Sequence, residues 1–291
     1  MKTLMPAVVI SVVVLVGCDR ERERVPVAPV EVTAAPTKVY RVHDWPLPIT
    51  AQAAQPDLII ASDGRVLLSW IEPRGKGHAL RFADFAAGKW RAPRDIATGS
   101  NWFVNWADTP HIAVTEDGAL WAHWLQKSAA ATYAYDVALV RSEDDGATWS
   151  QPMLVNDDGK PVEHGFVSLW PATRDAVGVS WLDGRNSVGE HAGHDGHAGA
   201  MTLRAARFDA KLQRSGESEI DAMTCDCCQT DIAATARGAL LVYRDRSHEE
   251  IRDIAVTRAH GDAWTPPRMV HADGWKMPAC PVNGPAVAAR G

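Results

Sequence analysis

Acidic or amide side chains recur two residues after an aromatic residue at four places in this sequence. The aromatic residues are Trp70, Trp124, Trp181 and Tyr243, and the residues that follow them are Glu72, Gln126, Asp183 and Asp245. Arginines stand close to three of these positions, namely Arg74, Arg185, Arg244 and Arg246. Glu72 and the arginines could bind an acidic sugar, while Asp183 and Asp245 could donate and accept a proton. The repetition also fits ion pairs between neighbouring structural units, and for any single residue it favours that role.

Four cysteines form a second group. Cys225, Cys227 and Cys228 lie within four residues, and Cys280 follows Cys227 by 53 residues. In an oxidising compartment we expect a disulfide from Cys280 to Cys227 or its neighbour Cys228, with Cys227 as the first choice. One alternative is a thiolate site for copper(I) or zinc that uses all four cysteines. Another is a redox pair formed by the two remaining thiols.

Three histidines on a glycine-rich stretch form a third group. His191, His194 and His197 could converge on a metal ion without backbone strain and would then join the cysteines in a copper or zinc site. The same composition describes a solvated insertion without function, which is the favoured interpretation. No cofactor is expected unless the metal interpretation holds.

Short strands in a repeating unit must position these groups. From about Ala51 the unit recurs roughly every 50 to 60 residues. Each copy has an apolar strand, a turn such as Asp63-Gly64, a second strand that ends near the aromatic residue, and a third strand; all but the third copy then carry a Trp-x-x-Pro signature. Strands in fours at this spacing predict an all-β fold, a β-propeller of four-stranded blades. About four and a half blades are present, because the unit restarts near the C-terminus.

One turn carries a specific motif. Ser142, Asp144, Gly146, Thr148 and Trp149 occupy every fixed position of the S-x-D-x-G-x-T-W Asp box. Residues 51–291 therefore resemble the sialidase-like, Asp-box (BNR-repeat) β-propellers. The resemblance implies that the box is structural and lies on the face opposite the ligand site. It also implies six blades in the complete protein, so we expect this chain to be a fragment of it.

The resemblance implies a glycan or another acidic carbohydrate as the ligand, and an exo-sialidase type of glycoside hydrolase if the protein is an enzyme. The catalytic residues of that family do not match. Its first arginine lies in an Arg-Ile-Pro motif, whereas the nearest candidate here is Arg41 in Tyr40-Arg41-Val42-His43. Its nucleophilic tyrosine lies in the last blade, beyond Gly291. Fold alone does not establish function, so hydrolysis lacks support from the residues.

Propeller topology predicts which groups share a face. The segments that lead into the first strand of each blade and the loops between the second and third strands gather on one face around the axis. That face would carry the acidic positions, the cysteines and the histidine stretch.

The N-terminal residues resemble a bacterial lipoprotein signal. In residues 1–17, Lys2 precedes an apolar run that ends in Leu15-Val16-Gly17, and Cys18 follows as the expected site of lipidation. Residues 18–50 read as a tether and residues 51–291 as the propeller. We expect a cell-envelope protein anchored to the periplasmic side of the inner membrane or to the outer membrane, and in contact with the membrane only through its lipid. The formal net charge of −6, without a strongly basic patch, argues against nucleic acid as a partner.

The predicted function is binding of a glycan or a small acidic ligand on the axial face, with hydrolysis as an extension. The rival predictions are a periplasmic metal-binding or redox module and a non-enzymatic scaffold for envelope assembly.

Overall fold

The computed structural model describes residues 41–187 and 200–289. The predicted signal, the lipidation site Cys18 and the three histidines His191, His194 and His197 lie outside the described residues. Two compact units divide the chain, residues 1–45 and 46–291. Every strand belongs to the second unit, and the described residues contain no helix. Accordingly, no described helix is available that could cross a membrane.

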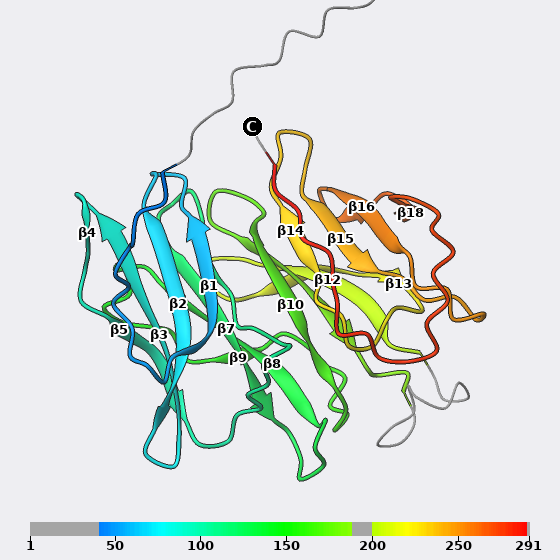
Figure 1. Ribbon diagram of the computed structural model, residues 1–291, viewed down its shortest axis with the longest axis horizontal. Helices are drawn as coiled ribbons and strands as arrows, with labels where there is room; N and C mark the ends of the chain where they lie inside the picture. The colour runs from blue at the N-terminus through cyan, green and yellow to red at the C-terminus, as the bar shows by residue number, and fades with distance from the viewer. Residues whose placement is uncertain (1–40, 188–199, 290–291) are drawn as a thin grey trace, which may run out of the picture. The chain divides into compact units, whose positions relative to one another are not determined.

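The described strands form four antiparallel sheets in chain order, as the repeat predicts (Figure 1). Sheet 1 contains β1 (Ala54–Ile60), β2 (Val66–Arg74), β3 (Gly77–Ala86), β4 (Lys89–Trp90) and β5 (Arg94–Gly99). Sheet 2 contains β6 (Ile112–Val114), β7 (Leu120–Lys127), β8 (Tyr135–Ser142) and β9 (Met153–Leu154). Sheet 3 contains β10 (His164–Pro171), β11 (Val177–Asp183), β12 (Thr202–Phe208) and β13 (Arg214–Asp221). Sheet 4 contains β14 (Asp231–Ala233), β15 (Leu240–Arg244), β16 (Ile254–His260), β17 (Ala263–Trp264) and β18 (Arg268–Met269).

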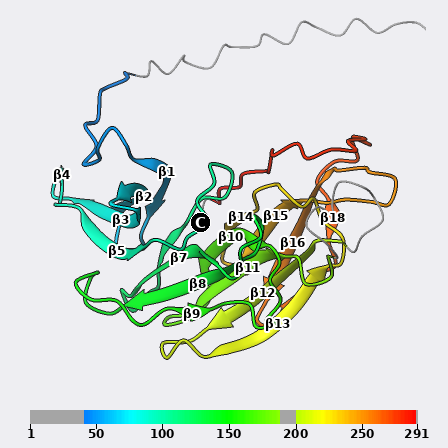
Figure 2. The ribbon, with the colours of Figure 1, turned by 90° about the horizontal axis from the view of Figure 1, so that it is seen from below.

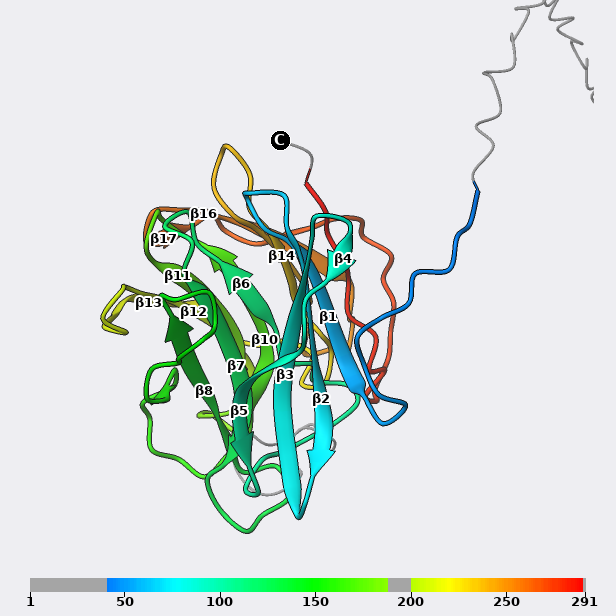
Figure 3. The same ribbon diagram turned by 90° about the vertical axis from the view of Figure 1, so that its left-hand side faces the viewer.

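The outer strand of sheets 1 and 4 is split into two pieces. Both β4 and β5 pair with β3, and both β17 and β18 pair with β16. The Trp-x-x-Pro signature explains the split, because Pro93 and Pro267 stand between the two pieces and a proline has no N–H to donate to a strand ladder. The third copy lacks the signature, and its outer strand β13 is continuous. Figure 3 looks onto sheet 1, where β1, β2 and β3 lie side by side.

The first strands of successive sheets adjoin, as they do in a propeller. Strand β1 contacts β6, β6 contacts β10, and β10 contacts β14. Side chains hold these strands together: Asp57 accepts a hydrogen bond from the Ile112 amide at 3.0 Å, and Asp231 accepts one from the Val287 amide at 2.7 Å. The second bond attaches the C-terminal segment, red in Figures 1 and 2, to β14.

Aromatic side chains fill the spaces between sheets. The side chains of Trp121, Trp181 and Tyr243 are fully buried between sheets, whereas the buried Trp70 packs within sheet 1. Trp124 joins a core cluster shared by sheets 1 and 2, Trp121 and Trp181 join one shared by sheets 2 and 3, and Tyr243 joins one shared by sheets 3 and 4. Burial of such large apolar surfaces is the main stabilising term that couples one sheet to the next.

The Asp box is a structural turn, as expected. Ser142 accepts a hydrogen bond from the Gly146 amide at 2.8 Å, and Asp144 accepts one from the Thr148 amide at 2.8 Å. Gly146 has a φ of 81°, and a Cβ there would overlap the Phe82 ring of sheet 1. Trp149 packs edge-on against the same ring, with centroids 6.0 Å apart. The box thus locks sheet 2 onto sheet 1.

Candidate functional site

The predicted acidic and arginine positions lie at one edge of the described sheets. Strand β2 ends at Arg74, β7 at Lys127, β11 at Asp183 and β15 at Arg244. Antiparallel pairing places the starts of the first and third strands at this same edge: Ala54 of β1 pairs with Ile71, and His164 of β10 pairs with Asp183. We call it the carboxylate edge. The Asp box begins at Ser142, the opposite end of β8 from Tyr135, so it lies roughly 25 Å away along the strand.

The aromatic residue and the acid two residues later contact each other directly. The indole N–H donates to Glu72 from Trp70 at 2.7 Å and to Asp183 from Trp181 at 2.7 Å. Sheet 2 has the same contact between Trp124 and Gln126, at 3.3 Å. An even step along a strand keeps both side chains on one face, which permits this bond. In sheet 4 the Tyr243 hydroxyl donates to Asp221 instead, at 2.5 Å.

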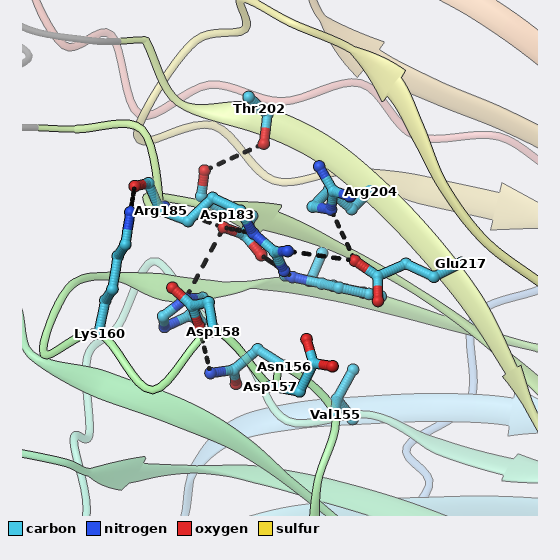
Figure 4. Close-up of polar contacts among 12 residues, drawn as sticks. Val155, Asn156, Asp157, Asp158, Lys160, Asp183, Arg185, Thr202, Arg204 and Glu217 are labelled. Atoms are coloured by element: carbon cyan, nitrogen blue, oxygen red, sulfur yellow. Dashed lines mark hydrogen bonds and ion pairs between the residues drawn. The ribbon is translucent and has the colours of Figure 1, made fainter. Parts of the chain in front are cut away.

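Asp183 is fully committed within its own sheet (Figure 4). Its carboxylate accepts bonds from Trp181, from the Arg185 amide at 2.9 Å and from the Arg185 guanidinium at 2.7 and 2.8 Å. Burial works against the ionised form, but the Arg185 bonds and nearby His164 outweigh it and lower the pKa of Asp183. A buried carboxylate with both oxygens occupied acts as an anchor for Arg185, directly after β11.

The candidate ligand-binding arginines also have partners in the chain. Arg185 pairs with Glu217 at 3.3 Å in addition to Asp183, and Arg74 pairs with Asp95. Arg246 pairs with Asp226 at 2.9 Å and with Glu250 at 2.6 Å. Arg244 donates to the carbonyls of Asn283 and Arg252 and lies over the Trp275 ring, 4.7 Å from its centroid. Glu72 pairs with Arg81 at 3.1 Å. The expected pairing between blades is wrong for Glu72, Arg74 and Arg185, whose ion pairs lie within a single sheet.

Asp245 differs from Asp183. It follows β15 and lies beside Asp221. Burial and the neighbouring Asp221 carboxylate raise the pKa of Asp245 to about 6. Of the two predicted acids, Asp245 is therefore the one that can exchange a proton near neutral pH.

Two further acids at the carboxylate edge were not predicted. The Tyr135 hydroxyl donates to Glu163 at 2.6 Å, and burial is the main reason why the pKa of Glu163 rises to about 8. Asp108 accepts a hydrogen bond from the Phe166 amide at 2.8 Å, and burial raises its pKa to about 7. Its other oxygen has no hydrogen-bond partner among the described residues. Both acids precede the first strand of a sheet, and propeller topology gathers such segments around the axis. This position was the sequence signal that could have identified the two acids.

His164 lies among carboxylates from three segments. Its ring nitrogens lie 3.1 Å from Asp158, 3.4 Å from Asp136 and 3.7 Å from Asp183. Burial works against the charged ring, but Asp136, Asp183 and Asp158 outweigh it and raise the pKa of His164. Ligand atoms of Asp158, His164 and Asp183 are close enough together to hold a metal ion. The Arg185 guanidinium already supplies one cation beside Asp183.

An exposed indole lies on the segment that leads to Asp108. Trp106 is 77% exposed and lies two residues before Asp108. The segment that carries it is held by residues of two other parts of the chain, because Gln55 of β1 donates to the Asp108 carbonyl at 3.2 Å and Gln229, before β14, donates to the Ala107 carbonyl at 2.7 Å. A large flat apolar ring held in solvent on a fixed backbone is a feature of binding surfaces.

The cysteine group lies at the same edge. Cys227 and Cys280 form the expected disulfide, with Cα atoms 6.0 Å apart, while Cys225 and Cys228 are free and buried. The Cys225 amide donates to the Arg244 carbonyl at 3.1 Å, which places the group beside the end of β15. The Cys228 thiol, with smaller contributions from the Cys227 amide and the Arg252 guanidinium, outweighs burial and lowers the pKa of Cys225 to about 7.

A cavity of about 560 Å³ lies at the opposite edge of sheet 2. Its lining includes the Asp-box residues Asp144, Thr148 and Trp149 together with Leu212. None of the predicted ligand-binding residues lines it.

Four-stranded antiparallel sheets whose first strands adjoin define a β-propeller of the Asp-box class. The chain belongs to the family of the BNR repeat-like domain, which matches residues 79–285. No curated protein is significantly similar to it in sequence.

Several solved structures resemble the fold. An α-L-arabinanase of Penicillium chrysogenum complexed with arabinobiose has a TM-score of 0.48 and 14% identity, over 78% of this chain and 69% of that one. The NanB sialidase of Streptococcus pneumoniae has a TM-score of 0.49 and 11% identity, over 77% and 52%. A polysaccharide lyase, Uly1, has a TM-score of 0.49 and 12% identity, over 75% and 50%. This chain therefore spans 50–69% of the length of these three proteins.

Proposed function

We propose that this chain binds carbohydrate at the carboxylate edge, next to Trp106. The observation that carries the proposal is the exposed indole on a fixed segment, two residues before a buried acid. The apolar face of a sugar ring packs on an indole, and the hydroxyls around that face bond to neighbouring polar groups. The similar solved structures are named as an arabinanase, a sialidase and a polysaccharide lyase. The support for carbohydrate binding by this chain comes from its own residues.

Glu163 suits a hydroxyl ligand. It is half-buried, and with a pKa of about 8 it retains its proton near neutral pH, so it can donate as well as accept a hydrogen bond. Asp108 is 3% exposed and its unpartnered oxygen is buried among the described residues, so a ligand does not reach that oxygen.

Neutral sugar units fit this edge better than acidic ones. The arginines proposed to hold an acidic sugar are Arg74, Arg185, Arg244 and Arg246. Arg74, Arg185 and Arg246 are paired with carboxylates. Arg244 donates to two carbonyls. An acidic ligand would have to displace one of these bonds, at a cost comparable to what it gains. We infer that the ligand is held by stacking and hydroxyl bonds, without an arginine clamp.

Glycoside hydrolysis is a second candidate, favoured by the raised pKa of Glu163. A carboxyl that keeps its proton at neutral pH can protonate the oxygen of a leaving sugar, as hydrolases of this kind require. Glu163 and Asp245 are then the candidate proton donors, and Asp183 has no free oxygen for the reaction.

Calorimetric titration of the full chain with neutral oligosaccharides and with a sialylated one tests the proposal. We expect binding of at least one neutral oligosaccharide. Trp106→Ala should weaken it about ten-fold, the equivalent of about 1.4 kcal/mol, and Trp106→Phe should weaken it less. Ile60→Ala is the matched control, because Ile60 is 76% exposed at the other end of β1. Equal affinity in all three variants, or binding of the sialylated compound alone, contradicts the proposal.

We also propose that Cys18 carries a lipid that holds the protein in the cell envelope. Metabolic labelling with a radioactive fatty acid, compared between the native chain and Cys18→Ala, tests this. Equal labelling of both chains would refute it.

A further inference from the structure

Four sulfur atoms lie together at the carboxylate edge of sheet 4. Cys225, Cys227 and Cys228 belong to the segment between β13 and β14, and Cys280 belongs to the C-terminal segment. The Sγ atoms of Cys225 and Cys228 are 2.9 Å apart, and those of Cys225 and Cys227 are 4.0 Å apart. The group therefore consists of an inner dithiol, Cys225 and Cys228, that adjoins an outer disulfide, Cys227–Cys280.

The inner and outer pairs differ in exposure. The side chains of Cys225 and Cys228 are 1% and 2% exposed, while both sulfurs of the outer pair belong to half-buried residues. A dissolved thiol or disulfide can therefore reach the outer pair first. The inner pair can exchange with solvent species only through its neighbour.

A buried cation faces the inner pair. Arg252, itself 2% exposed, donates from Nη1 to the Sγ atom of Cys225 at 3.2 Å. Its other nitrogens are held by Glu250 at 2.8 and 3.2 Å, so the guanidinium is fixed in place. A fixed guanidinium beside a sulfur stabilises the thiolate, which is the nucleophile in thiol–disulfide exchange. On the other thiol, the Asn283 amide lies 3.5 Å from the Sγ atom of Cys228.

We propose that these four cysteines form a thiol–disulfide relay that moves two electrons between the buried pair and the outer pair. In the first step the Cys225 thiolate attacks the Sγ atom of Cys227. A Cys225–Cys227 bond forms, the Cys227–Cys280 bond breaks, and Cys280 leaves as a thiolate.

In the second step Cys228 attacks the Sγ atom of Cys225. A Cys225–Cys228 bond forms, the Cys225–Cys227 bond breaks, and Cys227 leaves as a thiolate that takes up the proton lost by Cys228. The inner pair is oxidised and the outer pair is reduced, so no external oxidant is needed. The half-buried outer dithiol can then reduce the disulfide of a partner.

The separation of the inner sulfurs favours a relay over a zinc site. Two thiolates on one tetrahedral zinc ion, each about 2.3 Å from the metal, lie about 3.8 Å apart. The Cys225 and Cys228 sulfurs are closer than that, at 2.9 Å, and Cys227 is already bonded to Cys280. A pair held this close needs only a small movement to form a disulfide.

Mapping of disulfides in a one-disulfide form of the full chain tests the relay. Fully oxidised protein is treated with one equivalent of dithiothreitol, incubated, quenched with acid, alkylated and digested, and its linked peptides are identified by mass spectrometry. Peptide mapping keeps the fifth cysteine, Cys18, separate from the other four. We expect two isomers, one with Cys227–Cys280 and one with Cys225–Cys228. These isomers should interconvert until their ratio is constant.

Two variants separate the relay from a purely structural bridge. Cys228→Ser should stop the relay after its first step and accumulate Cys225–Cys227 with Cys280 alkylated. Cys225→Ser should retain Cys227–Cys280 alone. In Arg252→Gln the exchange should slow about ten-fold or more at neutral pH.

Three results would overturn the relay. One is a native chain that keeps only Cys227–Cys280 at every incubation time. The second is a Cys225→Ser chain in which the Cys227–Cys280 bond is still exchanged for a bond to Cys228. The third is four unmodified thiols that bind one zinc or copper ion in the protein as isolated. The unfolding curve of each variant shows whether it is folded. The isomer ratio of the native chain tests the relay even if a variant does not fold.

Discussion

Replacement of Glu163 by glutamine should change how stability depends on pH. Glu163 has a pKa of about 8 in the folded chain, against an ordinary value of 4.5. Between these two values the folded chain holds a proton that the unfolded chain has lost. The free energy of unfolding must therefore fall as the pH rises through this window, and the contribution is fully present only below pH 4.5.

The size of the effect follows from the two pKa values. At about 1.4 kcal/mol per pH unit, the interval from 4.5 to about 8 corresponds to about 5 kcal/mol. Glu163→Gln cannot ionise, and its amide oxygen can still accept the bond from the Tyr135 hydroxyl. The variant should match the native chain within about 1 kcal/mol at pH 5 and exceed it by roughly 3–5 kcal/mol at pH 8. Asp108 remains in both chains, so a part of the slope should persist.

Urea unfolding followed by tryptophan fluorescence at pH 5, 6, 7 and 8 measures the difference. Glu116→Gln, at an exposed turn of sheet 2, is the control and should leave the pH dependence unchanged. If native and Glu163→Gln curves run parallel from pH 5 to 8, then Glu163 is ionised in the folded chain and its role as a proton donor is refuted.

Two further predictions concern stability and are measured by the same unfolding experiment. Asp183→Ala should lower the free energy of unfolding by roughly 3–5 kcal/mol, because it leaves the Trp181 indole and the Arg185 guanidinium without their buried acceptor. Asp95→Ala is the control. It removes an ion pair whose side chains are 38–47% exposed and should lower the free energy of unfolding by less than about 1 kcal/mol. A cost below 1 kcal/mol for Asp183→Ala would show that this residue is not an anchor. Cys280→Ser opens a loop of 53 residues and should lower the free energy of unfolding by about 4 kcal/mol if chain entropy dominates. An unchanged midpoint of urea unfolding would show that the bridge does not constrain the unfolded chain.

The periodic features of the fold could be predicted from the sequence because each is local. The two-residue step from Trp181 to Asp183 depends only on the alternation of a strand. The Asp box depends on eight consecutive residues. The Cys227–Cys280 bridge depends on equal positions in adjacent repeats, which the propeller brings together. In each case a short rule of geometry replaces knowledge of the full structure.

The acids at the site could not be predicted in the same way. The pKa values of Asp108 and Glu163 are raised by burial, which depends on segments far apart in the sequence. Tyr135 reaches Glu163 because β8 of sheet 2 adjoins the start of sheet 3. The third repeat is also degenerate, so its first strand offered no clear register. Arginines were predicted to bind ligand because their type suggests it, but that type does not reveal the carboxylates and carbonyls with which the fold pairs them.

Protection of Trp106 from oxidation tests the proposed binding surface most directly. Hydroxyl-radical footprinting would compare the full chain alone with the chain saturated by the neutral oligosaccharide that it binds in calorimetry. The proposal predicts that oxidation of Trp106 falls several-fold, while Met269, 41% exposed on the outer strand of sheet 4, is unaffected. Unchanged oxidation of Trp106 together with protection of Leu212 or Trp149 would place the ligand in the Asp-box cavity and contradict the proposal.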